Sequence, residues 1–160
     1  MEYFSYDICI IGGLGHIGLP LGISFAKAGK KVILYDINPN ATDIVSQGRM
    51  PFLEAGAEKP LQETINKTLF ISSDKNAISQ SHFAILTIGT PIDEHLNPQF
   101  TLFKNFFEDI ISLLNDHQHI IIRSTVYPGT TEKVQQLLRE NGKNPRYRRR
   151  FTLALASYLT

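Results

Sequence analysis

Three glycines near the amino terminus have the spacing of a phosphate-binding loop. Gly13, Gly15 and Gly18 form the pattern G-x-G-x-x-G, directly after the apolar run YDICII and directly before a helical pattern. The first glycine of such a loop permits a tight turn, the second lets the backbone approach a pyrophosphate, and the third lets the helix pack against the strand. We expect the helix to begin near His16 and Ile17, so that its free N–H groups and positive dipole end face the anion.

A carboxylate in a second position supports a dinucleotide ligand. Asp36 ends the next apolar run, KVILYD, where dinucleotide folds place a carboxylate that accepts hydrogen bonds from the adenosine ribose. It would repel the 2′-phosphate of NADP, and the following Ile37 and Asn38 offer that phosphate no arginine. The sequence therefore favours NAD. Two alternatives stay open: a glycine-rich turn without a ligand, and an aspartate that only caps the turn before NPN.

Hydroxyl side chains follow two further apolar runs. Thr90 lies in GTP (89–91), and Ser124 and Thr125 begin STVYPGTT (124–131). Ligands of open α/β sheets bind outside the carboxyl ends of the strands, so these hydroxyls are expected to face the cofactor or the substrate. Ordinary turn chemistry is the alternative for each of them.

The elements that must position these residues follow from the hydrophobic pattern. Short Ile- and Val-rich runs predict buried strands, and helical periodicity lies between them. The predicted strands are 6–11, 31–36, 69–72, 83–88 and 119–123, and the predicted helices are 17–28, 41–47, 58–66, 103–114 and 130–142. This alternation predicts one domain over residues 1–160, with a doubly wound, mostly parallel α/β sheet of the Rossmann-like kind.

Composition narrows the class of protein further. The 160 residues carry a formal net charge of +1, which gives no argument for a nucleic-acid partner. No apolar run approaches the roughly 20 residues of a membrane helix, and no signal peptide is evident, so a cytoplasmic protein without a membrane partner is expected. Cys9 is expected to be a core residue, and no metal site is expected, because His117 and His119 lack a third ligand at suitable spacing.

The last residues, 143–160, differ in character from the rest. Four arginines lie within residues 146–150, and the apolar stretch FTLALASYLT follows them. The stretch could be a loop and a sixth strand, or the arginines could form a basic patch for nucleic acid. Because one basic patch on a nearly neutral chain is weak evidence for a nucleic-acid partner, the interpretation as a loop is favoured.

Five motifs in order carry a resemblance to a known family. GGLGHIGLPLG, YDIN, GRMPFLEAGAEKPL, TIGTPID and RSTVYPGTT resemble the NAD-binding domain of the UDP-glucose/GDP-mannose dehydrogenase family, most strongly over residues 6–142. Members oxidise a nucleotide sugar twice, from alcohol to acid, with two NAD. The resemblance implies that the backbone from Gly13 to Gly18 holds the pyrophosphate and Asp36 the ribose. It also implies that Thr90 contacts the cofactor, and that Thr125 lies beside the nicotinamide and helps hold the catalytic water.

The departures from the family pattern leave the activity of this chain open. The family's nucleophilic cysteine lies downstream, Cys9 does not match it, and counterparts of the central dimerisation helix and the UDP-binding domain are not found in these 160 residues. The chain is therefore expected to be the cofactor domain of a nucleotide-sugar dehydrogenase, or a truncated NAD-binding module without catalysis of its own, with the family's homodimer contacts mostly absent. The cofactor domain of a hydroxyacid-type dehydrogenase is a further alternative.

Overall fold

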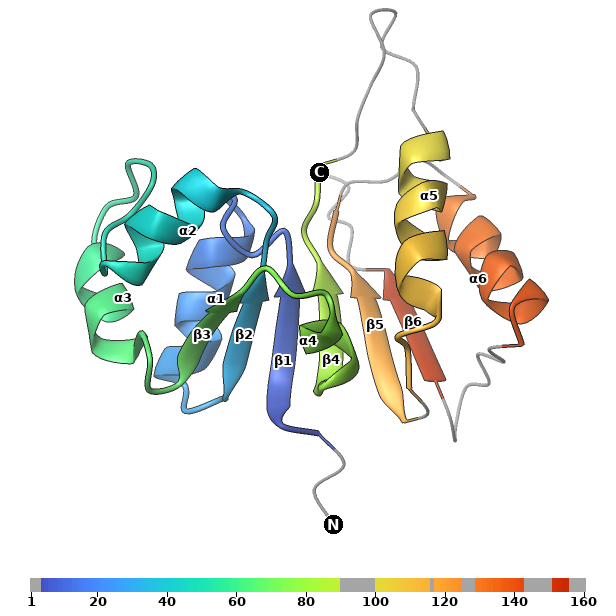
Figure 1. Ribbon diagram of the computed structural model, residues 1–160, viewed down its shortest axis with the longest axis horizontal. Helices are drawn as coiled ribbons and strands as arrows, with labels where there is room; N and C mark the ends of the chain where they lie inside the picture. The colour runs from blue at the N-terminus through green and yellow to red at the C-terminus, as the bar shows by residue number, and fades with distance from the viewer. Residues whose placement is uncertain (1–3, 90–99, 116, 125–128, 143–150, 156–160) are drawn as a thin grey trace, which may run out of the picture.

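The computed structural model describes residues 4–89, 100–115, 117–124, 129–142 and 151–155. Its centre is a six-stranded, all-parallel sheet with the order β3-β2-β1-β4-β5-β6 (Figure 1). The strands are β1 Tyr6–Ile11, β2 Val32–Tyr35, β3 Leu69–Ser72, β4 Ser81–Leu86, β5 Gln118–Ile122 and β6 Phe151–Leu155. This order reverses direction at β1, as in doubly wound dinucleotide-binding folds.

The five strands expected from the apolar runs are confirmed, with boundaries that differ by at most two residues. The sixth comes from the atypical tail, where β6 pairs in parallel with β5 over five residues. Of the two interpretations of the tail, the strand is thus correct for residues 151–155. The arginine cluster at 146–150 lies outside the described residues.

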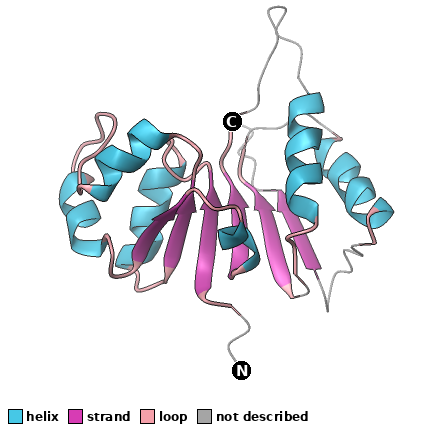
Figure 2. Ribbon diagram, viewed as in Figure 1, coloured by secondary structure: helices cyan, strands magenta, loops and turns pink. Residues whose placement is uncertain are grey.

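Helices cover both faces of the sheet (Figure 2). They are α1 Gly18–Lys27, α2 Pro39–Ser46, α3 Glu58–Thr64, α4 Asn76–Ser79, α5 Phe100–Ile111 and α6 Thr130–Glu140. Helices α1, α2 and α3 pack on one face with side chains such as Ile10 and Leu34, while α4, α5 and α6 pack on the other with Ile11 and Leu86. Successive strand residues serve opposite faces, which explains why the strands read as unbroken apolar runs.

The cysteine is a core residue, as expected. Cys9 is fully buried in β1, and burial raises the pKa of its thiol to about 12. Within the described ranges, no cluster of three His, Cys, Asp or Glu side chains could hold a metal ion. No helix in the described part of the chain has the length and apolarity needed to cross a lipid bilayer.

Candidate functional site

The turn between β1 and α1 depends on a glycine that precedes the expected pattern. Gly12 has a left-handed backbone with φ of 77°, which L side chains rarely adopt. Its N–H and that of Gly13 both donate to the carbonyl of Tyr35 in β2, at 3.0 and 3.1 Å. The left-handed residue of the turn is thus Gly12, which precedes the motif, and Gly13 lies within the same turn, which the N–H of Gly15 closes on the carbonyl oxygen of Gly12 at 3.3 Å.

Gly13 and Gly18 are explained by packing within the protein. A Cβ on Gly13 would lie 2.8 Å from both the carbonyl oxygen of Ile10 and the Cβ of Leu34. A Cβ on Gly18 would collide with the carbonyl oxygen of Gly12 and lie 2.8 Å from Thr87 Oγ1. These distances are too short for real contacts, so both positions need glycine for the fold alone. For Gly18 this agrees with the expected close packing of helix and strand.

Gly15 has no such explanation. A Cβ there would meet only the carbonyl oxygen of Gly12 at 3.5 Å, an ordinary contact, and its backbone is not left-handed. Neither sterics nor backbone conformation in the described part of the chain requires glycine at this position. Glycine is nevertheless found at the tip of a loop that faces outward from the carboxyl edge of the sheet, which is where a ligand would approach the backbone.

The amino terminus of α1 lies directly beside Gly15. No side chain caps this helix, and no acidic residue occupies its first turn. Among the described residues, no acceptor bonds the backbone N–H groups of His16, Ile17 or Gly18. The first N–H groups of a helix need partners from outside it, and a helix amino terminus favours an anion. The arrangement suits a pyrophosphate.

Asp36 lies at the end of β2, next to the glycine loop. Its Oδ2 accepts the N–H of Leu14 at 2.9 Å, and its Oδ1 accepts the N–H of Asn38 at 3.1 Å. The cap of α2 is Asn38, whose Oδ1 accepts from Asn40 and Ala41, so Asp36 is not the helix cap. A carboxylate offers about four acceptor positions, which leaves two for hydroxyl donors such as those of a ribose.

A contact that the sequence did not indicate joins the loop to a distant segment. The ring of His16 lies against the ring of Phe52, with centroids 4.1 Å apart. Phe52 belongs to MPFLEAG (50–56), and it packs together with Met50 against the α1 face of the core. The segment between α2 and α3 therefore supports the exposed side of the loop. In the sequence this segment indicated only the family resemblance, and nothing in its spacing indicated the contact.

The expected hydroxyls divide into two groups. Ser124 is buried and donates to the carbonyl oxygen of Ile88 at 2.6 Å, so the prediction that it faces a ligand is wrong and its turn chemistry is confirmed. Its hydroxyl ties the end of β5 to the end of β4. Thr90 and Thr125 lie outside the described residues.

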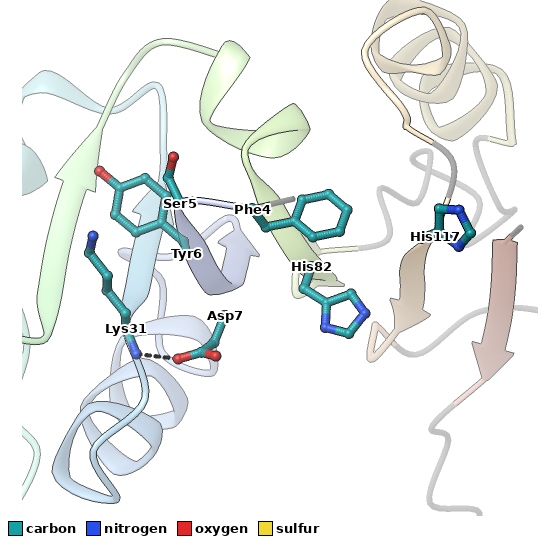
Figure 3. A pocket seen from close by; sticks show the side chains of 7 residues that line it. All are labelled: Phe4, Ser5, Tyr6, Asp7, Lys31, His82 and His117. Atoms are coloured by element: carbon teal, nitrogen blue, oxygen red, sulfur yellow. Dashed lines mark hydrogen bonds between the residues drawn. The ribbon is translucent and has the colours of Figure 1, made fainter. Parts of the chain in front are cut away.

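A cavity of about 560 Å³ opens at the opposite, amino-terminal edge of the sheet (Figure 3). Two of its charged groups are engaged within the protein: Asp7 accepts the backbone N–H of Lys31 at 2.8 Å, and Lys31 Nζ lies 5.1 Å from the centre of the Tyr6 ring. The cavity is lined by Phe4, Ser5, Tyr6, Asp7, Lys31, His82 and His117. Since ligands of open α/β sheets bind at the carboxyl edge, the glycine loop is the better candidate.

Comparison with known protein families identifies the domain. The model of the UDP-glucose/GDP-mannose dehydrogenase family, NAD binding domain, matches residues 6–157, which includes the tail beyond residue 142. The UDP-N-acetyl-D-glucosamine 6-dehydrogenase of Pseudomonas aeruginosa is 36% identical over 76% of this chain and 28% of its own length. The UDP-N-acetyl-D-mannosamine dehydrogenase of Campylobacter jejuni is 31% identical over 88% of this chain and 34% of its own length. The chain thus spans about a third or less of these curated relatives.

Solved structures show the same relationship. The UDP-D-ManNAc dehydrogenase of Pyrococcus horikoshii superposes with a TM-score of 0.82 at 27% identity, over 96% of this chain and 37% of that one. A 3-hydroxyisobutyrate dehydrogenase of Mycobacterium tuberculosis reaches a TM-score of 0.59 at 14% identity, a likeness of fold alone. The fold, the glycine loop, the carboxylate at the end of β2 and the family match agree, and the chain belongs to the UDP-glucose/GDP-mannose dehydrogenase family as its NAD-binding domain.

Proposed function

We propose that the loop from Gly12 to Gly18 holds the pyrophosphate of NAD and that Asp36 holds the adenosine ribose. The observation that carries this proposal is Gly15, where the described part of the chain leaves room for a side chain and yet has none. A bound pyrophosphate supplies the missing reason, because its oxygens would occupy the space that a side chain would fill.

The residues of the loop suit this ligand chemically. The backbone N–H groups of His16, Ile17 and Gly18 would donate to phosphate oxygens at the positive end of α1. Asp36 would accept the two ribose hydroxyls while it retains its bonds to the backbone. Its charge would repel a 2′-phosphate, so NAD would bind more tightly than NADP. By resemblance, Thr90 would contact the cofactor and Thr125 would lie beside the nicotinamide.

The reaction served by this domain is the oxidation of a nucleotide sugar. Relatives at 31–36% identity carry the names UDP-N-acetyl-D-glucosamine 6-dehydrogenase and UDP-N-acetyl-D-mannosamine dehydrogenase. NAD supplies the hydride acceptor for an alcohol-to-acid conversion of this kind. The role of the present chain is to bind the cofactor and to present it at the carboxyl edge of the sheet.

The 160 residues alone are proposed to lack turnover. The family reaction uses a cysteine nucleophile, whereas Cys9 is fully buried and burial raises its pKa to about 12. A buried thiol with this pKa is neither accessible nor ionised near neutral pH. Within these residues the domain would therefore act as a cofactor-binding module.

The test is calorimetric titration of the 160-residue protein with NADH, NADPH and ADP-ribose. We expect NADH and ADP-ribose to bind with similar affinity, because both carry the pyrophosphate and the adenosine ribose, and NADPH to bind at least tenfold more weakly. Binding of NADPH as tightly as NADH would contradict the assignment of Asp36. Absence of binding by all three would contradict the proposed function.

A further inference from the structure

Thr87 joins the end of β4 to the base of the glycine loop. It follows β4 directly, at the point where the sheet order changes direction. Its backbone N–H donates to the carbonyl oxygen of Ile11 at 2.9 Å, which continues the ladder between β4 and β1. Its hydroxyl Oγ1 lies 3.0 Å from the same oxygen and 3.1 Å from the carbonyl oxygen of Gly12. The side chain thus reaches from β4 into the base of the glycine loop.

The Gly12 carbonyl is the sensitive part of this contact. Its oxygen also accepts the N–H of Gly15 at 3.3 Å, and it would collide with a Cβ on Gly18. The oxygen therefore lies inside the curve of the loop, below the space expected to receive the pyrophosphate. A carbonyl oxygen carries partial negative charge, which is unfavourable close to a phosphate unless donors hold and offset it. The Thr87 hydroxyl is such a donor, with its one proton shared between the carbonyl oxygens of Ile11 and Gly12.

The opposite end of the same peptide unit is held by the other neighbouring strand. The N–H of Gly13, which shares a peptide unit with the Gly12 carbonyl, donates to the carbonyl oxygen of Tyr35 in β2 at 3.1 Å. The peptide unit between Gly12 and Gly13 is therefore held from β2 at its N–H and from Thr87 at its carbonyl oxygen. Because Gly12 is left-handed and glycine is conformationally free, these two hydrogen bonds restrict the conformation of the loop.

We propose that Thr87 is a positioning residue for the cofactor, whose hydroxyl holds the Gly12 carbonyl so that the N–H groups at the start of α1 face the pyrophosphate. This inference rests on the proposed function of the loop. Thr87 is expected to affect the binding of the pyrophosphate and to make no contact with the adenosine.

The test compares Thr87→Val, which keeps the shape but removes the hydroxyl, with Thr87→Ser, which keeps the hydroxyl. Each variant is titrated with ADP-ribose by calorimetry and with adenosine by NMR. Loss of the Thr87 hydroxyl leaves the Gly12 carbonyl with only the N–H of Gly15, and loss of one such hydrogen bond corresponds to a roughly tenfold weaker affinity for ADP-ribose in Thr87→Val. We expect the affinity for adenosine to stay unchanged and Thr87→Ser to restore binding of ADP-ribose to within about twofold.

Ser81→Ala serves as the matched control. The hydroxyl of Ser81 donates to the carbonyl oxygen of Ala77 at 2.8 Å, at the start of β4 and far along the strand from the loop. Its loss should lower the melting temperature without changing the affinity for ADP-ribose. If Thr87→Val does not fold, Thr87→Ala removes the same hydroxyl and replaces it in the titrations.

The outcomes separate this inference from the proposed function. Wild-type affinity for ADP-ribose in Thr87→Val would overturn the positioning role, and so would an equal loss for adenosine or a failure of Thr87→Ser to restore binding. If the unaltered protein does not bind ADP-ribose, the proposed function itself fails. If the unaltered protein binds ADP-ribose and Gly15→Val does not, the proposed function of the loop is supported. The Thr87 variants alone then test the positioning role of Thr87.

Discussion

The backbone N–H of Leu14 donates a hydrogen bond of 2.9 Å to Asp36 Oδ2. The carboxylate that is proposed to bind the ribose therefore also holds the glycine loop by a hydrogen bond. The proposed ribose site and the proposed pyrophosphate site thus share Asp36. A substitution at Asp36 is expected to act on both.

Replacement of Asp36 by alanine should weaken NADH binding by about 1.5–3 kcal/mol, because charge-assisted hydrogen bonds to the ribose and the support of Leu14 are both lost. Asp36→Asn should keep an acceptor for Leu14 but remove the repulsion of a 2′-phosphate. We expect calorimetry to show a reduced preference for NADH over NADPH in this variant. An unchanged dissociation constant for NADH in Asp36→Ala would mean that Asp36 serves only the turn.

The lowered pKa of His119 predicts that the stability of the protein depends on pH. Burial and the neighbouring His82, whose ring centre lies 4.9 Å away, lower the pKa of His119 below its ordinary value. The folded protein therefore binds this proton less readily than the unfolded chain. The stabilisation is present above the unfolded pKa of about 6.5 and is lost as the pH falls through the lower, folded pKa.

Urea titrations at a series of pH values between neutral and mildly acidic test this relationship. The free energy of unfolding should fall more steeply with decreasing pH in the unaltered protein than in His119→Gln, which does not titrate. Parallel curves for the two proteins would show that His119 contributes nothing to the pH dependence.

The state of Cys9 predicts that the 160-residue protein does not produce NADH from a nucleotide sugar. Incubation with NAD and UDP-glucose, UDP-N-acetylglucosamine, UDP-N-acetylmannosamine or GDP-mannose should leave the near-ultraviolet absorbance unchanged. A full-length relative with known activity provides the positive control. Sustained turnover by protein of confirmed intact mass would contradict the buried, inert role of Cys9.

The fold could be predicted from the sequence because its signals are local. Runs such as YDICII are apolar on consecutive positions, and this requires burial on both sides of a parallel strand. The short helix α4 was not expected, because four residues carry too little periodicity to be recognised. The sixth strand was expected only as part of one interpretation of the tail, and its parallel pairing with β5 confirms it for residues 151–155.

The site was predictable in type but not in detail. The glycine spacing and Asp36 indicated a dinucleotide loop, yet the left-handed residue is Gly12, which the motif does not specify. Ser124 could not be oriented from sequence, because inward and outward hydroxyls at a strand end look alike. His16 and Phe52 are in contact although they lie 36 positions apart in the sequence. Helical or strand periodicity gives no information about contacts over such a sequence separation.

We propose that Gly15 is glycine because of a ligand, whereas Gly13 is glycine because of the fold. Gly13→Ala should lower the free energy of unfolding by about 1–3 kcal/mol, since its Cβ would press on Leu34 and the carbonyl oxygen of Ile10. Gly15→Val should unfold like the unaltered protein, because Gly15 is exposed and a Cβ there meets only one atom, at an ordinary contact distance.

The most direct measurement is therefore calorimetric titration of folded Gly15→Val with NADH, with folding verified by circular dichroism. We expect an unaltered spectrum and no detectable binding, because the valine side chain would occupy the space of the pyrophosphate. Binding of NADH with the affinity of the unaltered protein would contradict the proposal.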